Sequence, residues 1–198
     1  MRKITVLSFI SIDGVMQGPG SPDEDMSNDF KLGGWVAPFG DEDSTDIMQK
    51  QLEPADLLLG RKTFDIWEQY WPAHADNWPG INEVTKYVLT NTVDSTEWAN
   101  VVFLKNIDAI KKIKASEGLD IKIWGSSELV QLLLEHGLVD EFWLNIHPVL
   151  LGKGKRLFNN GALPATFEII ESKRTTKGIF MVNYKKAGPV KTNKAGPE

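Results

Sequence analysis

Residues 57–67 read LLLGRKTFDIW, a run of three leucines that ends at a glycine and continues into two cationic residues. The leucines predict a strand buried on both faces, and the spacing of Phe64 and Trp67 predicts a helix that begins directly after the glycine. The first backbone N–H groups of such a helix have no intrahelical partner. Together with the helix dipole and the side chains of Arg61 and Lys62, they form a candidate anion site. An ordinary strand-to-helix junction with surface cations is the alternative interpretation of this stretch.

The whole chain has the composition of one globular domain. It has 198 residues, of which 41% are hydrophobic and 25% charged, which is enough to bury a core. The net charge of -5 argues against a nucleic-acid-binding protein. The absence of cysteine excludes disulfides, thiol nucleophiles and cysteine-ligated zinc, and the three histidines disfavour a histidine-rich metal site. We therefore expect no metal.

Two further sequence features concern location and domain limits. No apolar run approaches the ~20 residues of a membrane span, and the N-terminus lacks a signal-peptide pattern, so we expect a cytoplasmic protein. From residue 187 onward the chain is polar and contains Gly and Pro, which predicts a disordered tail. The expected division is a folded domain at 1–186 and a tail at 187–198.

Hydrophobic periodicity predicts an alternation of strands and helices followed by a terminal hairpin, which is typical of an α/β fold with a mostly parallel sheet and an antiparallel edge. A long loop rich in glycine and proline is expected at 15–43. The predicted strands are 4–12, 57–60, 86–90, 101–104, 121–124, 139–147, 167–173 and 179–185. The predicted helices are one capped by Asp43-Ser44 that runs to about 52, one from 61 to 71, one from 107 to 118 and one from 128 to 136.

Small or polar residues follow three of these strands, at 60–63, 90–91 and 125–127. In parallel sheets, ligands bind outside the carboxyl ends of the strands. The convergence of the three segments predicts a phosphate-bearing ligand that lies across adjacent strand ends.

Five motifs carry a resemblance to a known family: SIDGVMQG at 11–18, LLLGRKTFDIW at 57–67, KYVLTN at 86–91, IKIWGSSELVQLLLEHGLVDEFWLNIHPVLLGKGKRLF at 121–158, and the final hairpin. From Ile4 to about Tyr184 the chain resembles the dihydrofolate reductase superfamily. The closer likeness is to its bacterial branch related to the reductase domain of the bifunctional riboflavin-biosynthesis deaminase/reductase. The resemblance implies a dihydrofolate reductase-like three-layer sandwich.

The resemblance also implies an NADPH-dependent oxidoreductase that transfers a hydride to a small pterin-, pyrimidine- or flavin-precursor-like heterocycle. Arg61 would face the adenosine 2′-phosphate, and the turn at 125–127 would hold the pyrophosphate. The family usually has two or three consecutive glycines in that turn, whereas this chain has Gly125-Ser126-Ser127. The implied cofactor-binding residues are Phe9, Ile12, Met16, Gly60, Arg61, Lys62, Thr63, Thr90, Asn91, Trp124, Gly125, Ser126, Ser127, Glu128 and Leu129.

The proton donor is sought among carboxylates near the long loop. Asp46 is placed roughly where the family has its buried carboxylate, with Asp29 and Asp43 as competitors, and a solvated surface role is the alternative for each. For Trp67 the alternative to a substrate contact is a core position, and His147 is interpreted as structural. The candidate substrate-binding residues are Asp13, Trp35, Phe64, Trp67 and Asn145.

The sequence also bears on two other classes of function. A non-catalytic nucleotide-binding module of the same fold would keep the phosphate turns and lack an acid in the pocket. A zinc-dependent deaminase needs cysteine ligands and is excluded by their absence. The riboflavin branch tends to pair through sheet edges, so a homodimer is compatible with the resemblance.

Overall fold

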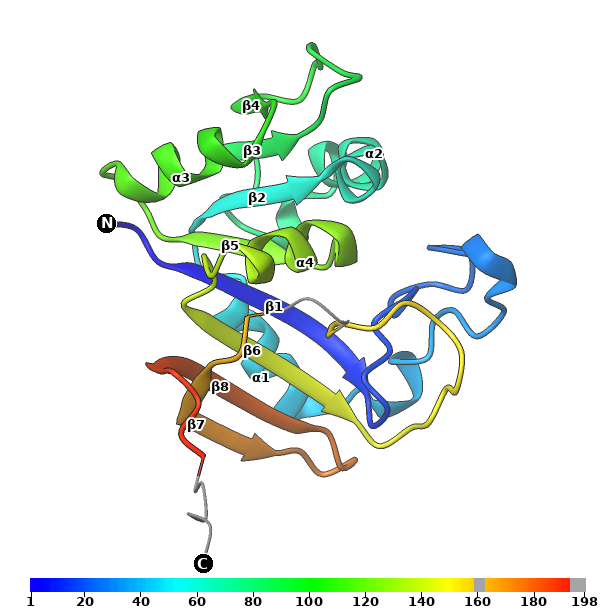
Figure 1. Ribbon diagram of the computed structural model, residues 1–198. Helices are drawn as coiled ribbons and strands as arrows, with labels where there is room; N and C mark the ends of the chain where they lie inside the picture. The colour runs from blue at the N-terminus through cyan, green and yellow to red at the C-terminus, as the bar shows by residue number, and fades with distance from the viewer. Residues whose placement is uncertain (159–162, 193–198) are drawn as a thin grey trace, which may run out of the picture.

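A computed structural model describes residues 1–158 and 163–192, which form one eight-stranded sheet with helices on both faces (Figure 1). The strand order is β4-β3-β2-β5-β1-β6-β8-β7. The strands are β1 (Ile4–Ser11), β2 (Asp56–Gly60), β3 (Lys86–Leu89), β4 (Val101–Leu104), β5 (Ile121–Trp124), β6 (Glu141–His147), β7 (Thr166–Arg174) and β8 (Phe180–Gly188). The α-helices are α1 (Glu42–Gln51), α2 (Arg61–Tyr70), α3 (Ile107–Ala115) and α4 (Ser127–Glu135).

The strand pairing confirms the predicted sheet. The neighbours from β4 to β6 pair in parallel, whereas β6 with β8 and β8 with β7 pair antiparallel. Each of the predicted strands and α-helices is present, with ends that differ by a few residues. The chain therefore has the predicted α/β architecture with an antiparallel C-terminal hairpin.

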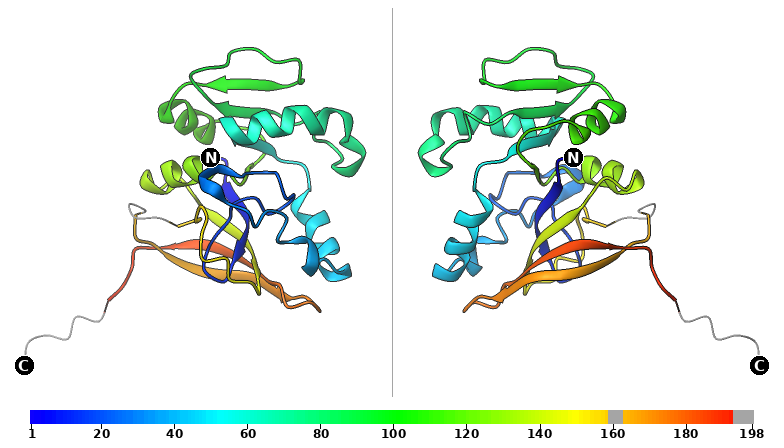
Figure 2. Two further views of the ribbon diagram at one scale, coloured as in Figure 1. Left: turned by 90° about the vertical axis from the view of Figure 1, so that its right-hand side faces the viewer. Right: turned by 90° about the vertical axis from the view of Figure 1, so that its left-hand side faces the viewer.

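The three layers follow from the alternation of side chains along the strands. Leu58 of β2 packs in the core cluster that contains the buried faces of α3 and α4. Leu57 and Leu59 point to the opposite face, where they pack with Phe64 of α2 and with Met48 of α1. Figure 2 shows the two helix pairs on opposite sides of the sheet. Since both faces are covered, β2 is apolar from Leu57 to Leu59, as the leucine run predicts.

Two predicted boundaries change in the structure. The N-cap of α1 is Asp41, whose carboxylate accepts a hydrogen bond from Ser44 N at 2.8 Å; the expected cap, Asp43, instead contacts Lys173 of the hairpin at 2.7 Å. Asp41 precedes the first helical residue directly, which is the position from which a side chain reaches the free amides. Strand β8 extends to Gly188, two residues into the predicted tail, and residues 193–198 of that tail lie outside the described part.

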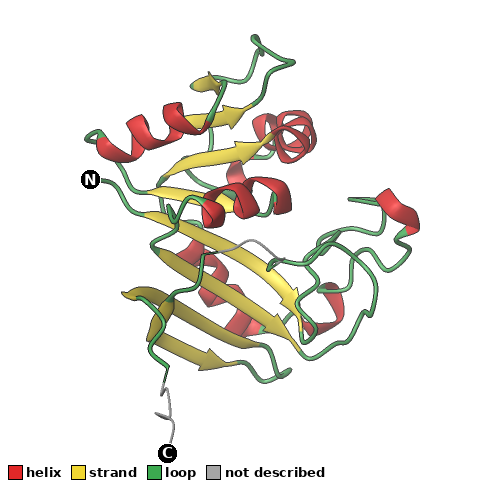
Figure 3. Cartoon of the chain, viewed as in Figure 1, coloured by secondary structure: helices red, strands yellow, loops and turns green. Residues whose placement is uncertain are grey.

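The long loop after β1 is packed against a second segment far along the chain. Val15 and Arg156 form an antiparallel bridge, and Met16 N donates to Lys155 O at 2.8 Å. Phe30 and Trp35 of the loop are buried in a small cluster with Val15. Figure 3 shows these loops gathered beyond the ends of β1 and β6. Among the described residues, no helix combines the length and apolar character that crossing a bilayer would need.

Candidate functional site

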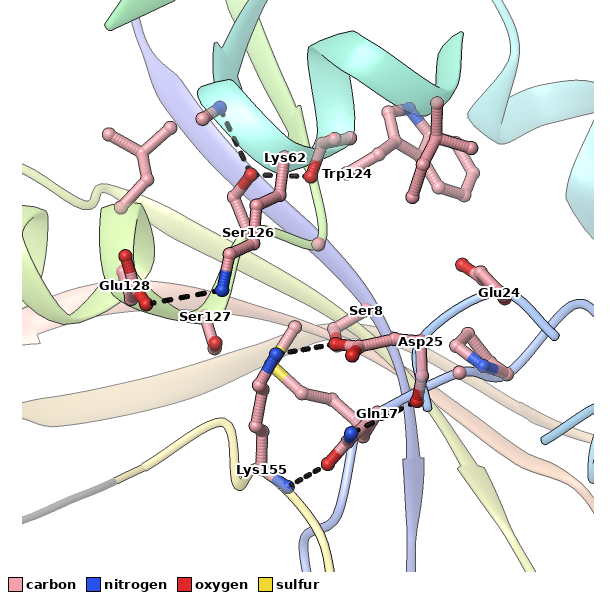
Figure 4. A pocket seen from close by; sticks show the side chains of 18 of the residues that line it. Ser8, Gln17, Glu24, Asp25, Lys62, Trp124, Ser126, Ser127, Glu128 and Lys155 are labelled. Carbon is pink, nitrogen blue, oxygen red and sulfur yellow. Dashed lines mark hydrogen bonds and ion pairs between the residues drawn. The ribbon is translucent and has the colours of Figure 1, made fainter. Parts of the chain in front are cut away.

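A cavity of about 560 Å³ lies at the carboxyl ends of the adjacent strands β1, β5 and β2. Figure 4 shows side chains from the strand ends, from the starts of α2 and α4, and from the long loop around it. Thirteen of the sequence-predicted residues line the cavity: Phe9, Met16, Gly60, Arg61, Lys62, Thr63, Trp67, Trp124, Gly125, Ser126, Ser127, Glu128 and Leu129. The structure thus brings together two of the three predicted strand-end segments.

The two α-helices that start at this cavity differ from the other two α-helices at their N-termini. α2 begins after Gly60, which has no side chain to cap it, and α4 begins after Ser126, whose side chain makes no capping bond to its own helix. By contrast, side chains of Asp41 and Asn106 cap α1 and α3. An uncapped helix start leaves several backbone N–H groups and the positive end of the dipole for an external acceptor. The two uncapped starts that line one cavity are suited to a ligand with more than one phosphate.

Ser126 connects the two helix starts. Its Oγ accepts a hydrogen bond from Gly60 N at 3.0 Å and lies 2.6 Å from Thr63 Oγ1. Ser126 has a φ of 62°, in the left-handed region that favours glycine. A Cβ atom at Gly60 would come within 2.5 Å of Ser126 Oγ, so only glycine permits this approach. Ser126, which stands where the resemblance implies a glycine, is therefore part of the hydrogen-bond network of the candidate site.

Arg61 lies at the rim of the cavity and is held by two neighbours. Its Nε donates to Asp65 Oδ1 at 2.5 Å, and its Nη1 donates to Thr92 Oγ1 at 2.8 Å. The residues expected beside it, Thr90 and Asn91, do not line the cavity; Thr90 is buried and Asn91 is exposed. The hydroxyl that Arg61 contacts is that of Thr92.

The inner end of the cavity is aromatic. The ring centroids of Phe9 and Trp124 lie 6.2 Å apart, and Trp67 of α2 completes the aromatic lining of the cavity. Trp124 is buried, and within the described part of the chain its Nε1 has no hydrogen-bond partner. Ile12, which was expected here, does not line the cavity and is 65% exposed, because it lies beyond the end of β1. A dry wall of this kind suits a planar ring that carries few polar atoms on its faces.

Four carboxylate residues line the cavity, namely Glu24, Asp25, Asp65 and Glu128, and neither of the expected proton donors is among them. Asp46 is exposed on α1, and Asp29 is exposed and paired with Lys31 at 3.3 Å; neither lines the cavity. Glu24 and Asp25 do line it. They lie in a loop without periodicity, so no pattern in the sequence aligned them with the strand ends.

Asp25 is held in its ionised form. Burial acts to raise its pKa, but hydrogen bonds from Lys155 and Ser27 outweigh burial and hold the pKa below its usual value. Lys155 Nζ lies 2.5 Å from Asp25 Oδ2, and Gln17 joins the same cluster by accepting from Lys155 N at 3.0 Å and donating to Asp25 O at 3.0 Å. The cluster fixes the long loop over the cavity and supplies a charge pair there, without a neutral acid.

Four of the five candidate substrate residues lie outside the cavity. Phe64 is fully buried against Trp98 and Phe103, since it occupies the inward face of α2, and only Trp67 lines the cavity. The other three make hydrogen bonds elsewhere. The indole of Trp35 donates to Gln17 O at 2.8 Å, and Asn145 exchanges amide hydrogen bonds of 3.1 Å with Gln51. Asp13 accepts hydrogen bonds from Ser11 Oγ at 2.6 Å and from Gly152 N at 2.9 Å. These polar groups hold loops and helices together.

His147 is also structural. It is buried among Phe9, Trp35 and Phe39, and its Nδ1 lies 2.9 Å from Asn145 O. Burial lowers its pKa, so the imidazole is neutral near pH 7.

A second cavity of about 410 Å³ adjoins the first and shares Gln17, Ser127, Glu128 and Lys155 with it. Lys153 and Arg156 add two further cations to its lining. Each of these cations has a carboxylate partner, namely Asp29 at 3.8 Å for Lys153 and Asp13 at 3.4 Å for Arg156.

Comparison with known families and curated proteins gives the following similarities. The family model described as RibD C-terminal domain matches residues 2–181. The uncharacterized protein YyaP of Bacillus subtilis (strain 168) is 28% identical over 190 residues, which cover 92% of this chain and 94% of YyaP. The uncharacterized protein YwjB of the same strain is 28% identical over 163 residues, 80% of this chain and 83% of YwjB.

Solved structures share the fold. A candidate riboflavin biosynthesis protein from Shewanella sp. PV-4 aligns with a TM-score of 0.63 at 22% identity, over 94% of this chain and 99% of that one. A pyrimidine reductase-like protein from Corynebacterium diphtheriae aligns with a TM-score of 0.61 at 14% identity, over 94% and 92% of the two chains. At these identities the alignments establish a common architecture.

Proposed function

The chain belongs to the RibD C-terminal domain family, and on this basis we propose that it is an NADPH-dependent oxidoreductase that transfers a hydride to a small pterin-, pyrimidine- or flavin-precursor-like heterocycle. The family indicates a reductase-type function. The nicotinamide cofactor, its phosphorylated form and the substrate class are the proposal.

The observation that carries the proposal is the pair of uncapped helix starts on one cavity. Gly60 and Ser126 precede these helices, and Arg61 and Lys62 add positive charge at the same rim. Backbone N–H donors, helix dipoles and cations in one cavity match the pyrophosphate and 2′-phosphate of NADPH.

The aromatic end of the cavity suits the other half of the cofactor. When bound, the nicotinamide would supply the hydride. Phe9 and Trp124 would exclude water from the face of its ring, and Trp67 would wall the space left for the substrate. Excluding water from this end protects the reaction from competing solvent.

The proton that completes the reduction is expected to come from water. Asp25 is partly buried, as a proton-donating carboxylate in such a site would be. Its ion pair with Lys155 keeps it charged, so it has no proton to donate near pH 7. Its role would be to hold the long loop in place and to orient a water or a polar substrate group.

The same ion pair favours the second candidate function, a non-catalytic nucleotide-binding module. Such a module would use the helix starts and would need no neutral acid in the cavity. Cytoplasmic location and a homodimer are further parts of the proposal. For the dimer, the edge strand β7 offers Ile169 and Ile170, which are 57% and 51% exposed.

The test is titration of the purified protein with NADPH and NADH, followed by quenching of tryptophan emission and energy transfer to the reduced nicotinamide. Trp67 and Trp124 line the cavity and should report occupancy. Lys111→Ala on α3, away from the cavity, is the matched control for Arg61→Ala at the rim. NADPH binding followed by oxidation with pterin, pyrimidine or flavin-precursor acceptors would support the reductase. Binding without turnover on any of them would support the module, and no binding of either cofactor would exclude the reductase and favour a module for another nucleotide.

A further inference from the structure

His147 packs between the first strand and the long loop, behind the first cavity. It is the last residue of β6 and is 2% exposed. The rings of Phe9, Trp35 and Phe39 surround its imidazole edge-on, with centroid distances of 5.8, 5.3 and 5.8 Å. Phe9 belongs to β1, whereas Trp35 and Phe39 belong to the long loop. The imidazole is therefore a point at which the loop is held against the strand.

These ring contacts lead to two different sides of the cavity. Phe9 lines the cavity beside Trp124, and the two rings form its aromatic wall. The indole of Trp35 donates to Gln17 O at 2.8 Å, and Gln17 lines the cavity and donates from its side chain to Asp25 O at 3.0 Å (Figure 4). The same histidine thus contacts the aromatic wall directly and the polar loop side through one indole.

The surroundings of His147 suit a neutral imidazole. Its Nδ1 donates to Asn145 O at 2.9 Å, since a carbonyl oxygen only accepts. Burial lowers the pKa of His147, and hydrogen bonds to the backbone of Asn145 and Ile10 oppose burial without outweighing it. A positive charge at this position would lose its hydration among aromatic rings, which is costly without an anionic partner.

The structure supplies no such partner from the elements around the imidazole. The charged side chains beside these contacts are Asp13 beyond the end of β1, Asp41 beyond Phe39, and Lys177 in the turn between β7 and β8. Each has hydrogen-bond partners of its own. Burial and backbone groups account for the pKa shift of His147, with no contribution from these charges. Protonation would therefore leave a buried imidazolium without a counter-charge.

We propose that His147 is a positioning residue of the cavity, whose neutral imidazole holds the long loop against the aromatic wall and whose protonation releases the loop and weakens ligand binding. The sign follows from linkage. A base with a lowered pKa favours the packed state above its ordinary pKa, about 6.5 for histidine, and this contribution is lost as the pH falls from there to the lowered value. A single proton changes the equilibrium by at most about tenfold per pH unit. The inference rests on the proposed function only in naming the ligand as a nicotinamide dinucleotide.

The first test uses NMR on the wild-type protein without ligand. The chain has three histidines, and His74 and His136 are exposed, so the Cε1–H signals give one buried and two exposed titrations. The Trp35 indole N–H, which bonds to Gln17 O, reports the packing of the loop. Its protection against hydrogen exchange, relative to a free indole at the same pH, should fall about threefold or more between about pH 7 and about pH 5.5. Constant protection, or a His147 pKa at or above the ordinary value, would overturn the inference.

The second test compares the pH dependence of binding between variants. His147→Asn removes the titrating ring and keeps a side-chain N–H that can donate to Asn145 O. From about pH 7 to about pH 5.5 the Kd for NADPH should rise about threefold more in wild type than in His147→Asn. Titration of the phosphate of NADPH itself is common to both proteins and cancels in this ratio. His136→Gln, at the exposed end of α4, is the control and should keep the wild-type pH dependence.

Folding of the variants is followed by circular dichroism. If His147→Asn does not fold, His147→Phe replaces it, since phenylalanine keeps a ring among the three aromatic contacts and cannot titrate. Equal pH dependence of binding in wild type and in the folded variant would overturn the inference.

The two tests separate this inference from the proposed function, because the first needs no ligand. If the protection of Trp35 follows the protonation of His147 but neither NADPH nor NADH binds, the positioning role stands and the proposed reductase fails. If NADPH binds and the protection of Trp35 stays constant with pH, the positioning role alone fails. If the protection is constant and neither dinucleotide binds, both fail.

Discussion

Arg61 and Asp65 form an ion pair within the first turns of α2, with Arg61 Nε 2.5 Å from Asp65 Oδ1. Both side chains line the cavity and are 38% exposed, so the charge that should attract a 2′-phosphate is partly offset by a carboxylate beside it. The arginine is also oriented, because Asp65 and Thr92 hold two of its nitrogens.

Replacing Arg61 tests the 2′-phosphate assignment. Arg61→Ala should raise the Kd for NADPH about tenfold, since a charge-assisted hydrogen bond is lost, and should change the Kd for NADH less than about twofold. Fluorescence titration with both cofactors measures the ratio, with Lys111→Ala as the control. Equal losses for the two cofactors would defeat the assignment.

Replacing Asp65 should increase the preference for NADPH over NADH. Asp65→Asn keeps the shape of the side chain and removes its charge, so the affinity for NADPH should rise about threefold with little change for NADH. The gain should shrink as salt is added, because the interaction is partly exposed. A lower affinity for NADPH in this variant would show that Asp65 serves mainly to orient Arg61.

The Lys155–Asp25 pair gives a prediction for pH. Hydrogen bonds from Lys155 and Ser27 outweigh burial and hold the pKa of Asp25 below its usual value. The ionised carboxylate therefore stabilises the fold when the pH is above the usual pKa of Asp. This stabilisation is lost as the pH falls through the lowered pKa of Asp25. Lys155→Met removes the main opposing partner and leaves burial, so the pKa of Asp25 should rise. Carboxyl carbon NMR measures it in both proteins, and an unchanged pKa would contradict the attribution to Lys155.

The contact between α1 and the C-terminal hairpin should weaken in acid. Hydrogen bonds to Asp41, first from Lys177 N and also from Ser44, lower its pKa to about 2. The lowered pKa means that these bonds stabilise the fold above the usual pKa of Asp and are lost as pH falls from about 4 towards 2. Asp41→Asn should therefore flatten the acid dependence of the thermal midpoint in this window. Glu42→Gln, an exposed neighbour, is the control, and identical acid profiles for Asp41→Asn and wild type would refute the prediction.

Much of the fold could be predicted because its signals are local. The leucine run before Gly60 and the aromatic spacing after it determine β2 and α2, and the same logic holds for β5 and α4. Parallel strands bring their carboxyl ends to one edge, so the part of the candidate site at the ends of β2 and β5 followed from the same signals.

The rest of the candidate site depends on contacts between residues that are distant in the sequence. Asp25, rather than Asp46 or Asp29, lies in the cavity because Lys155 and Gln17 hold a loop that has no periodicity of its own. Asn145 has the strand position expected of a pocket residue, yet its amide pairs with Gln51, 94 residues away.

The sequence alone therefore determined the strands, the helices and the helix starts that can bind an anion, since these depend on residues a few positions apart. Only the tertiary structure decided which carboxylates of the long loop line the cavity, which nitrogens of Arg61 are hydrogen-bonded and how Ser126 contacts the start of α2. Side-chain hydrogen bonds form between groups that the folded chain brings within about 3 Å of each other. The local pattern of the sequence does not predict these distances between residues far apart in the chain.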